Sequence, residues 1–153
     1  MDLLTPNRTR ESLAYVYRHI VTFDETNVMG NVYYVRHIAW QGRCRELFLK
    51  DNAPGVLEEL AAGLRLVTIS VSCDYFAEVQ AFDEIEVHMR LAFIRQHRLG
   101  LHFDYLRNDE GGHTRIARGF QQLGCMRITA SGLTPTEPPG QLSSALDPYW
   151  ACL

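Results

Sequence analysis

A helix-length periodicity between two groups of strand-like segments is the feature that most restricts the fold of this chain. In residues 32–50, one side of a helix is marked by residues three or four positions apart: Tyr34, Ile38, Gly42, Arg45 and Leu49. Pro54 and Gly55 end this helix, and residues 56–62 are predicted to form a short second helix. The pattern therefore predicts one long helix of about 19 residues.

Strand-like segments lie on both sides of the long helix. Residues 13–23, before it, are rich in the aromatic and β-branched types that suit a pleated surface. After the helices come four longer strand-like runs separated by hairpin signals: residues 64–79, 85–95, 99–107 and 114–127. This order predicts an α+β fold with an antiparallel sheet of five strands.

Length and composition fit one globular domain over residues 1–153. The chain has 153 residues, of which 46% are hydrophobic and 22% charged, and this is sufficient for a real core. The Pro- and Ser-containing segment that starts at residue 134 predicts a C-terminal tail over residues 134–153. The last aromatic residues of that tail, Tyr149 and Trp150, are expected to dock on a neighbouring surface.

Charge, cysteine and hydropathy patterns exclude several classes of protein. Fifteen basic and 18 acidic residues give a net charge of −3, so no global basic field argues for a nucleic-acid partner. The cysteines show no CxxC spacing and the first 20 residues carry charges, which predicts a reduced, cytoplasmic protein. No uninterrupted apolar run of about 18 residues occurs, so a membrane span is not expected. The six histidines lack metal-binding spacing, and we expect no metal or cofactor.

A polar turn leads directly into the long helix. Residues 22–31 read TFDETNVMGN, and the helical pattern begins immediately afterwards. Backbone N–H groups in the first turn of a helix have no intrahelical partner and lie at the positive end of its dipole. They suit an oxygen that gains negative charge during acyl transfer. The simpler interpretation is a turn and helix cap without catalytic role, since Asn and Gly serve those purposes in many proteins.

The same stretch resembles the 4-hydroxybenzoyl-CoA thioesterase group of the hot-dog fold. That group has roughly Asp-x-x-Gly where this chain has Asn27 through Gly30, so Asn27 replaces the carboxylate. The paired aromatics Tyr33 and Tyr34 and the Cys44-Arg45 step extend the resemblance. It implies a hot-dog fold, in which the five-stranded sheet wraps the long central helix.

More narrowly, the Asp-to-Asn change resembles the thioesterases of enediyne polyketide biosynthesis. The resemblance implies hydrolysis of a polyene (β-keto)acyl thioester on the acyl carrier protein domain of an iterative polyketide synthase. Decarboxylation of the released acid to a methyl ketone is the step that can follow. It also implies a homo-oligomer, arranged as a dimer of dimers, with sites between subunits.

Three residues are the candidates for catalysis. The backbone N–H of Tyr34 is expected to polarise the thioester carbonyl, and Asn27 to orient the attacking water. Arg45 needs an anion or an acceptor if it is buried. It lies about 16 Å along the helix from Tyr34, so it is predicted to act across a subunit interface or to form a structural ion pair.

Other residues are assigned to substrate and partner binding. A rod-like apolar acyl chain is expected to contact nine residues near the motif and on the next strand: Met29, Gly30, Asn31, Tyr33, His37, Leu64, Leu66, Ile69 and Phe76. Arg36 and Arg43 are candidates for docking phosphopantetheine or an acidic carrier protein, although a solvated face explains them as well. Asp24 and Glu46 are the possible substitute acids.

Two other functions remain open from the sequence. A non-catalytic acyl-binding hot-dog protein would also lack the carboxylate, and an acyl-CoA thioesterase for small aromatic acids would differ only in its substrate carrier. A hot-dog dehydratase is not supported, because the chain has no His-Phe-Pro type loop.

Overall fold

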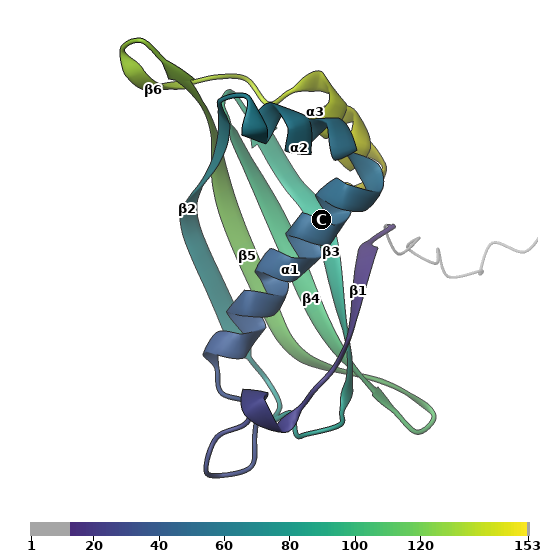
Figure 1. The fold of residues 1–153 in the computed structure, drawn as a ribbon. Helices are drawn as coiled ribbons and strands as arrows, with labels where there is room; N and C mark the ends of the chain where they lie inside the picture. The colour runs from purple at the N-terminus through teal and green to yellow at the C-terminus, as the bar shows by residue number, and fades with distance from the viewer. Residues whose placement is uncertain (1–12, 153) are drawn as a thin grey trace, which may run out of the picture.

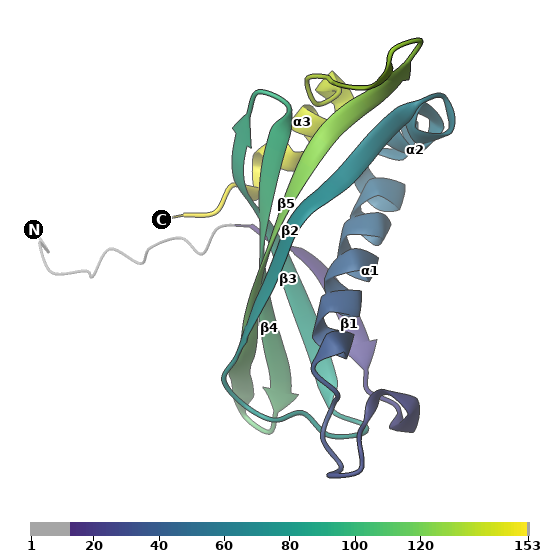
Figure 2. The same ribbon diagram turned by 90° about the vertical axis from the view of Figure 1, so that its left-hand side faces the viewer.

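One long helix lies across one face of a curved antiparallel sheet (Figures 1 and 2). The computed structural model describes residues 13–152. Helix α1 (Val35–Asn52) is followed directly by the shorter helix α2 (Pro54–Ala61). The predicted α+β hot-dog arrangement, with a long central helix against the sheet, is confirmed.

The order of strands in the sheet explains why α1 must be long. The five predicted strands are β1 (Tyr15–Ile20), β2 (Leu64–Tyr75), β3 (Glu84–Arg95), β4 (Arg98–Asp109) and β5 (Gly112–Thr129). They lie in the order β1-β3-β4-β5-β2, and every neighbouring pair is antiparallel. Strands β1 and β2 therefore occupy opposite edges, so the helices between them cross the whole sheet (Figure 1).

The face of α1 that packs on the sheet differs from the predicted face. The residues of α1 that are buried are His37, Trp40, Gln41, Cys44, Phe48 and Leu49. Of the predicted stripe only Leu49 is fully buried, while Tyr34 is exposed and Arg45 half-buried. The apolar periodicity misplaced the stripe because His37 and Gln41 are polar residues on the buried side. Their polar atoms consequently need partners inside the domain.

Helix α1 begins later than predicted and strand β2 ends earlier than predicted. Both differences lie beside the start of α1. The helix begins at Val35 rather than at residue 32, because the Val32 N–H donates to the Val79 carbonyl at 2.7 Å. Strand β2 ends at Tyr75 rather than at residue 79, because the N–H groups of Phe76 and Ala77 both donate to the Ile116 carbonyl. The residues that precede α1 and those that follow β2 are therefore outside regular structure, and they form the walls of a pocket.

The C-terminal segment predicted as a tail is part of the packed domain. A sixth short strand, β6 (Gly132–Pro135), pairs with β5, and α3 (Gly140–Leu146) buries Leu142 and Leu146 in the core. After the 3-10 helix η2 (Asp147–Tyr149), the Ala151 N–H donates to the Leu91 carbonyl at 2.8 Å. Residues 1–12 and 153 of the domain predicted over 1–153 lie outside the described residues. Within residues 13–152, no helix is long and apolar enough to cross a membrane.

The contact between α1 and β5 supplies a test of this packing. A Cβ atom at Gly119 in β5 would lie 2.0 Å from Nε2 of Gln41 and 3.2 Å from the Ser72 carbonyl oxygen. Gly119→Ala is therefore expected to displace Gln41 and to lower the free energy of unfolding by about 1–3 kcal/mol. Gly42→Ala is the matched control, since no atom lies within 4 Å of its added Cβ. It is expected to stabilise the helix by about 1 kcal/mol. Urea unfolding measures both variants against the parent, and a Gly119→Ala midpoint at or above the parent value would contradict the contact.

Candidate functional site

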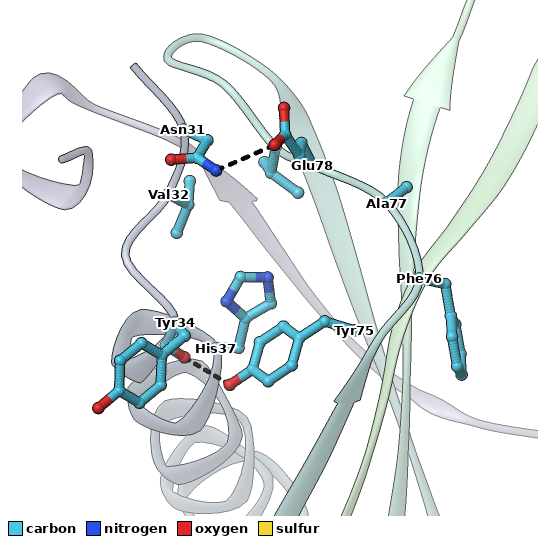
Figure 3. A pocket seen from close by; sticks show the side chains of 9 residues that line it. Asn31, Val32, Tyr34, His37, Tyr75, Phe76, Ala77 and Glu78 are labelled. Carbon is cyan, nitrogen blue, oxygen red and sulfur yellow. Dashed lines mark hydrogen bonds between the residues drawn. The ribbon is translucent and has the colours of Figure 1, made fainter. Parts of the chain in front are cut away.

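A pocket lies at the N-terminal end of α1, between the helix and the segment that follows β2 (Figure 3). Its volume is about 310 Å³. Nine residues line it: Asn31, Val32, Tyr34, His37, Tyr75, Phe76, Ala77, Glu78 and Val79. Four of these, Asn31, Tyr34, His37 and Phe76, were predicted as site residues.

Hydrogen bonds connect the two walls of the pocket. The Tyr75 hydroxyl at the end of β2 donates to the Tyr34 carbonyl at 2.6 Å, and Nδ2 of Asn31 donates to Oε1 of Glu78 at 3.3 Å (Figure 3). The start of α1 is therefore fixed against the end of β2.

The start of α1 has no side-chain cap. Tyr34 is the N-cap residue, no side chain caps the helix, and the first turn contains no acidic residue. The positive end of the helix dipole is therefore not neutralised by the helix itself. Because Tyr34 lines the pocket, an electronegative oxygen in the pocket can use backbone donors at the start of the helix.

A buried carboxylate holds the preceding turn. Glu25, in the 3-10 helix η1 (Phe23–Glu25), accepts from Nε2 of His19 at 2.6 Å, from Nε1 of Trp40 at 2.8 Å and from the Thr22 N–H at 3.2 Å. Burial by itself raises the pKa of this carboxyl, but those hydrogen bonds outweigh it and hold the pKa below its usual range. The Glu25 carbonyl also accepts from the Tyr33 N–H at 2.9 Å. Glu25 thus connects β1, α1 and the chain that enters α1.

His37 is the buried titratable residue of the pocket. The residue is 3% exposed, and neither ring nitrogen is in hydrogen-bond geometry with a group of residues 13–152. The ring packs edge-on to Tyr75 at 4.8 Å between centroids and lies 5.0 Å from Trp40. Burial lowers the pKa of His37 to about 4, although the Tyr34 carbonyl and the Glu25 charge act to raise it. The imidazole is consequently neutral at pH 7.

Asn27 does not line this pocket. Its Oδ1 accepts from the Met29 N–H at 2.9 Å, and its carbonyl accepts from the Gly30 N–H at 2.9 Å, so it closes the turn. Gly30 has a φ of +87°, a conformation that other residues rarely adopt. With one hydrogen bond on Oδ1, Asn27 can still offer a ligand the second lone pair of Oδ1 and its two amide hydrogens. The predicted role of Asn27 in orienting the attacking water stays a prediction.

Arg45 lies apart from the pocket, in the interior of α1. Its Nη1 donates to Oε1 of Gln121 at 2.9 Å, and Gln121 in turn donates to Oε1 of Gln41 at 3.1 Å. Burial lowers the pKa of Arg45, whereas the nearby Glu46 raises it. No carboxylate lies within ion-pair distance of Arg45 in residues 13–152, so the predicted structural ion pair within the subunit is not formed there.

The remaining predicted contacts are scattered over the domain. Met29, Tyr33 and Ile69 are exposed, Leu64 is fully buried, and Leu66 borders a small apolar void of about 10 Å³ beside Arg45. These residues do not surround one cavity within the subunit.

The two arginines predicted for docking also lie apart. Nη2 of Arg36 donates to the Asp24 carbonyl at 3.0 Å. Arg43 lies beside Tyr17, which raises the pKa of its guanidinium, in an open groove of about 510 Å³. They do not form one joint patch around the pocket.

Two functional candidates were missed by the sequence analysis. Tyr75 and Glu78 fall in the stretch 64–79, which had been predicted as one continuous strand. The strand ends where two successive N–H groups share the Ile116 carbonyl. The alternation of apolar and polar residues in the sequence gives no signal of this event. Only the acidic Glu78 at the end of that stretch could have marked the position.

Comparisons with known proteins identify the class to which this fold and site belong. A family model of the Thioesterase-like superfamily matches residues 21–146. A dynemicin thioesterase, whose crystal structures concern induced-fit and allosteric effects upon polyene binding, is similar with 49% identity and a TM-score of 0.88. The match covers 92% of this chain and 99% of that chain. A search of curated proteins gives no significant match.

Two more distant structures show the fold alone. A 1,4-dihydroxy-2-naphthoyl-CoA thioesterase from Synechocystis has 18% identity and a TM-score of 0.71 over 88% of this chain and 96% of that chain. A mutant 4-hydroxybenzoyl-CoA thioesterase complexed with 4-hydroxybenzoyl-CoA has 14% identity and a TM-score of 0.75 over 88% of this chain and 99% of that chain. The fold is that of the hot-dog thioesterases. The chain belongs to the Thioesterase-like superfamily, and its resemblance to the enediyne group is supported by the dynemicin thioesterase.

The burial of neutral His37 has a measurable effect on stability. A histidine with a folded pKa of about 4 takes up its proton more readily in the unfolded chain, so stability falls as the pH drops below about 6.5. The expected loss is about 2 kcal/mol between pH 7 and pH 5. His37→Phe is expected to abolish this loss and to be more stable than the parent at pH 5, because Phe leaves no unpaired buried nitrogen. Thermal unfolding at both pH values measures the effect, and an equal acid loss in the variant would contradict it.

Proposed function

We propose that the protein hydrolyses a polyene (β-keto)acyl thioester carried by the acyl carrier protein domain of an iterative enediyne polyketide synthase. The main support is the 49% identity to a dynemicin thioesterase over nearly its whole length. The pocket at the uncapped start of α1 supplies the electrostatic feature that thioester cleavage needs. Decarboxylation of the released β-keto acid to a methyl ketone is part of the proposal.

The thioester carbonyl is placed at the start of α1. Its oxygen accepts from the backbone N–H of Tyr34, and the positive end of the helix dipole stabilises the negative charge that forms there. Asn27 does not line the pocket within one subunit. Its Nδ2 is therefore assigned as the second donor in a site formed between two subunits, with the amide oriented by the Met29 N–H at Oδ1. In well-studied cases one such donor is worth about 2.7 to 4 kcal/mol.

Arg45 is assigned to a second contact with the substrate or with the neighbouring subunit. Within residues 13–152 the half-buried guanidinium has the neutral Gln121 as its hydrogen-bond acceptor, which favours an additional anionic or carbonyl partner. A homodimer, and from it a dimer of dimers, brings such a partner across a two-fold axis. The β-keto oxygen of the acyl chain is the alternative partner.

A CoA thioesterase is the second candidate function. Two structural neighbours carry CoA thioesterase names, but at 18% and 14% identity they support the fold alone. A non-catalytic acyl-binding protein is the third, since Asn27 cannot act as a base. If the substrate is carried by an acyl carrier protein, Arg36 and Arg43 are the candidate contacts for its phosphopantetheine or its acidic surface.

Release of free thiol distinguishes the three functions. The protein is incubated with the same β-ketoacyl group on a holo acyl carrier protein and on CoA, and thiol is measured against time. We expect catalytic release with a higher kcat/KM on the carrier protein. A preference for CoA would favour the second function, and release at the buffer rate on both would leave only acyl binding.

Asn27→Ala tests the second carbonyl donor. The variant is expected to lower kcat by about 10²-fold, since the transition-state oxygen loses one hydrogen bond. Val28→Ala is the matched control on the same turn, because Val28 is fully exposed and its side chain has no hydrogen-bond donor to offer the carbonyl oxygen. Equal values of kcat in the two variants would remove Asn27 from the mechanism.

Arg45→Ala tests the cation. The loss is expected in kcat/KM, at about 10²-fold, because truncating one partner of a buried charged contact costs about 2–5 kcal/mol. Arg98→Ala, at an exposed arginine at the start of β4, is the control. Normal turnover by Arg45→Ala would assign Arg45 to packing alone.

A further inference from the structure

The pocket contains a buried base that the proposed carbonyl donors do not use. His37 projects from the first turn of α1 between Tyr75 and Val32, with Asn31 and Glu78 across the pocket (Figure 3). His37 is 97% buried, and no group in residues 13–152 is in hydrogen-bond geometry with either ring nitrogen, although the Tyr34 carbonyl is close enough to raise the pKa of the ring. Leaving one such buried polar atom unpaired costs about 1–3 kcal/mol.

A purely structural role does not require an imidazole at this position. The neighbours of His37 are the rings of Trp40, Tyr75 and Tyr105, at 5.0, 4.8 and 5.7 Å between centroids. Such an aromatic cluster would accept a phenyl ring without any polar cost. Both nitrogens are enclosed in this structure, and His37 lines the 310 Å³ pocket. A rotation of the ring toward the cavity would give one nitrogen a partner there, because the pocket is large enough for an acyl thioester carbonyl and a water.

We propose that His37 is the proton acceptor that activates the hydrolytic water in this pocket. The inference rests on the proposed thioesterase function. The water oxygen forms a bond to the thioester carbon while one of its protons moves to the free imidazole nitrogen. As the carbon–sulfur bond breaks, the same proton moves from the imidazolium to the thiolate. The products are the free acid and the thiol, and His37 is again neutral.

The base strength of His37 is appropriate to the missing group. Its pKa of about 4 is close to the value of about 3.9 for an ordinary aspartate. The neutral imidazole therefore has about the proton affinity of the aspartate that Asn27 replaces. Unlike a carboxylate, it carries no charge that repels the developing oxyanion nearby.

Glu78 is the competing base in the same pocket. It is exposed, and its Oε1 accepts from Nδ2 of Asn31, while its backbone carbonyl accepts from Nη1 of Arg107 at 2.7 Å. These contacts assign Glu78 to the outer edge of the pocket, where it closes the wall formed with Asn31. His37 is the deeper group and the one with unoccupied nitrogens.

Titratable groups face His37 from several elements. Glu25 faces it from η1 and raises its pKa, Tyr75 and Tyr105 face it from β2 and β4, and Glu78 lies across the pocket. The Tyr105 hydroxyl donates to the His37 carbonyl at 2.6 Å, so it is not available to the ring. No cation among these groups lowers the proton affinity of the ring, and burial is the dominant cause.

Steady-state kinetics of two variants test the proposal on the full-length protein, with a β-ketoacyl thioester of N-acetylcysteamine as substrate. His37→Phe keeps the ring volume and removes the base, and it is expected to lower kcat by 10²- to 10⁴-fold with KM within about threefold of the parent. His37→Ala leaves a space for added imidazole, which is expected to raise the kcat of this variant at least tenfold. His113→Phe, in the exposed β4–β5 hairpin, is the matched control.

Each outcome decides between named alternatives. Full activity of His37→Phe, a loss confined to KM, or no rescue of His37→Ala by imidazole would overturn the role of His37. A larger loss in Glu78→Gln than in His37→Phe would assign the base to Glu78 instead. An inactive parent protein on every thioester would overturn the proposed function itself, which separates that failure from the failure of His37.

A measurement on the parent protein covers the case in which a variant does not fold. Nitrogen-15 NMR of the labelled protein is expected to show one neutral histidine down to about pH 4. Its ring signals are expected to shift when a non-hydrolysable ketone analogue of the thioester occupies the pocket. A titration of His37 near pH 6.5, or signals unchanged by the saturating analogue, would contradict the proposal.

Discussion

The hydrogen-bonded carboxylate of Glu25 is the interaction on which the geometry of the site depends. It joins His19 on β1 to Trp40 on α1, and the backbone of the same residue holds the Tyr33 N–H. Both charged oxygens have donors, so the burial of this charge is compensated. As a result, the turn that enters α1 is held from the strand before it and from the helix after it, and the start of α1 has one fixed position beside the pocket.

The length of α1 follows from the strand order, but its function follows from which residues it buries. Its sheet-facing side combines Trp40, Phe48 and Leu49 with the polar His37 and Gln41. Gln41 is satisfied by the Ser72 carbonyl at 3.1 Å and by Gln121. His37, one turn earlier and next to the pocket, is not satisfied by any described protein group. This difference separates a structural polar residue from one that is available for chemistry, and it agrees with the trade between stability and activity at functional sites.

The proposed chemistry divides the work of the missing aspartate between separate groups. A carboxylate at the position of Asn27 would combine the roles of base and hydrogen-bond partner in one side chain. In this chain the turn-closing Asn27 and the start of α1 provide donors, and a neutral imidazole of comparable basicity provides the acceptor. Arg45 lies too far along the helix to join them within one subunit, which connects its role to assembly.

The sequence alone determined the architecture, because the periodicities that mark strands and helices involve residues close together in the sequence. It predicted the long helix, the five principal strands and the turn at Asn27 to Gly30, and the resemblance at that turn indicated the superfamily. The sequence did not determine the rotation of α1, since His37 and Gln41 look solvent-facing until the sheet surrounds them. It also did not reveal that β2 ends at Tyr75, or that Glu78 and Tyr75 meet Asn31 and Tyr34. Those features arise from contacts between residues more than 40 positions apart, and only the tertiary structure could decide them, because burial and hydrogen-bond partners are set by the whole fold.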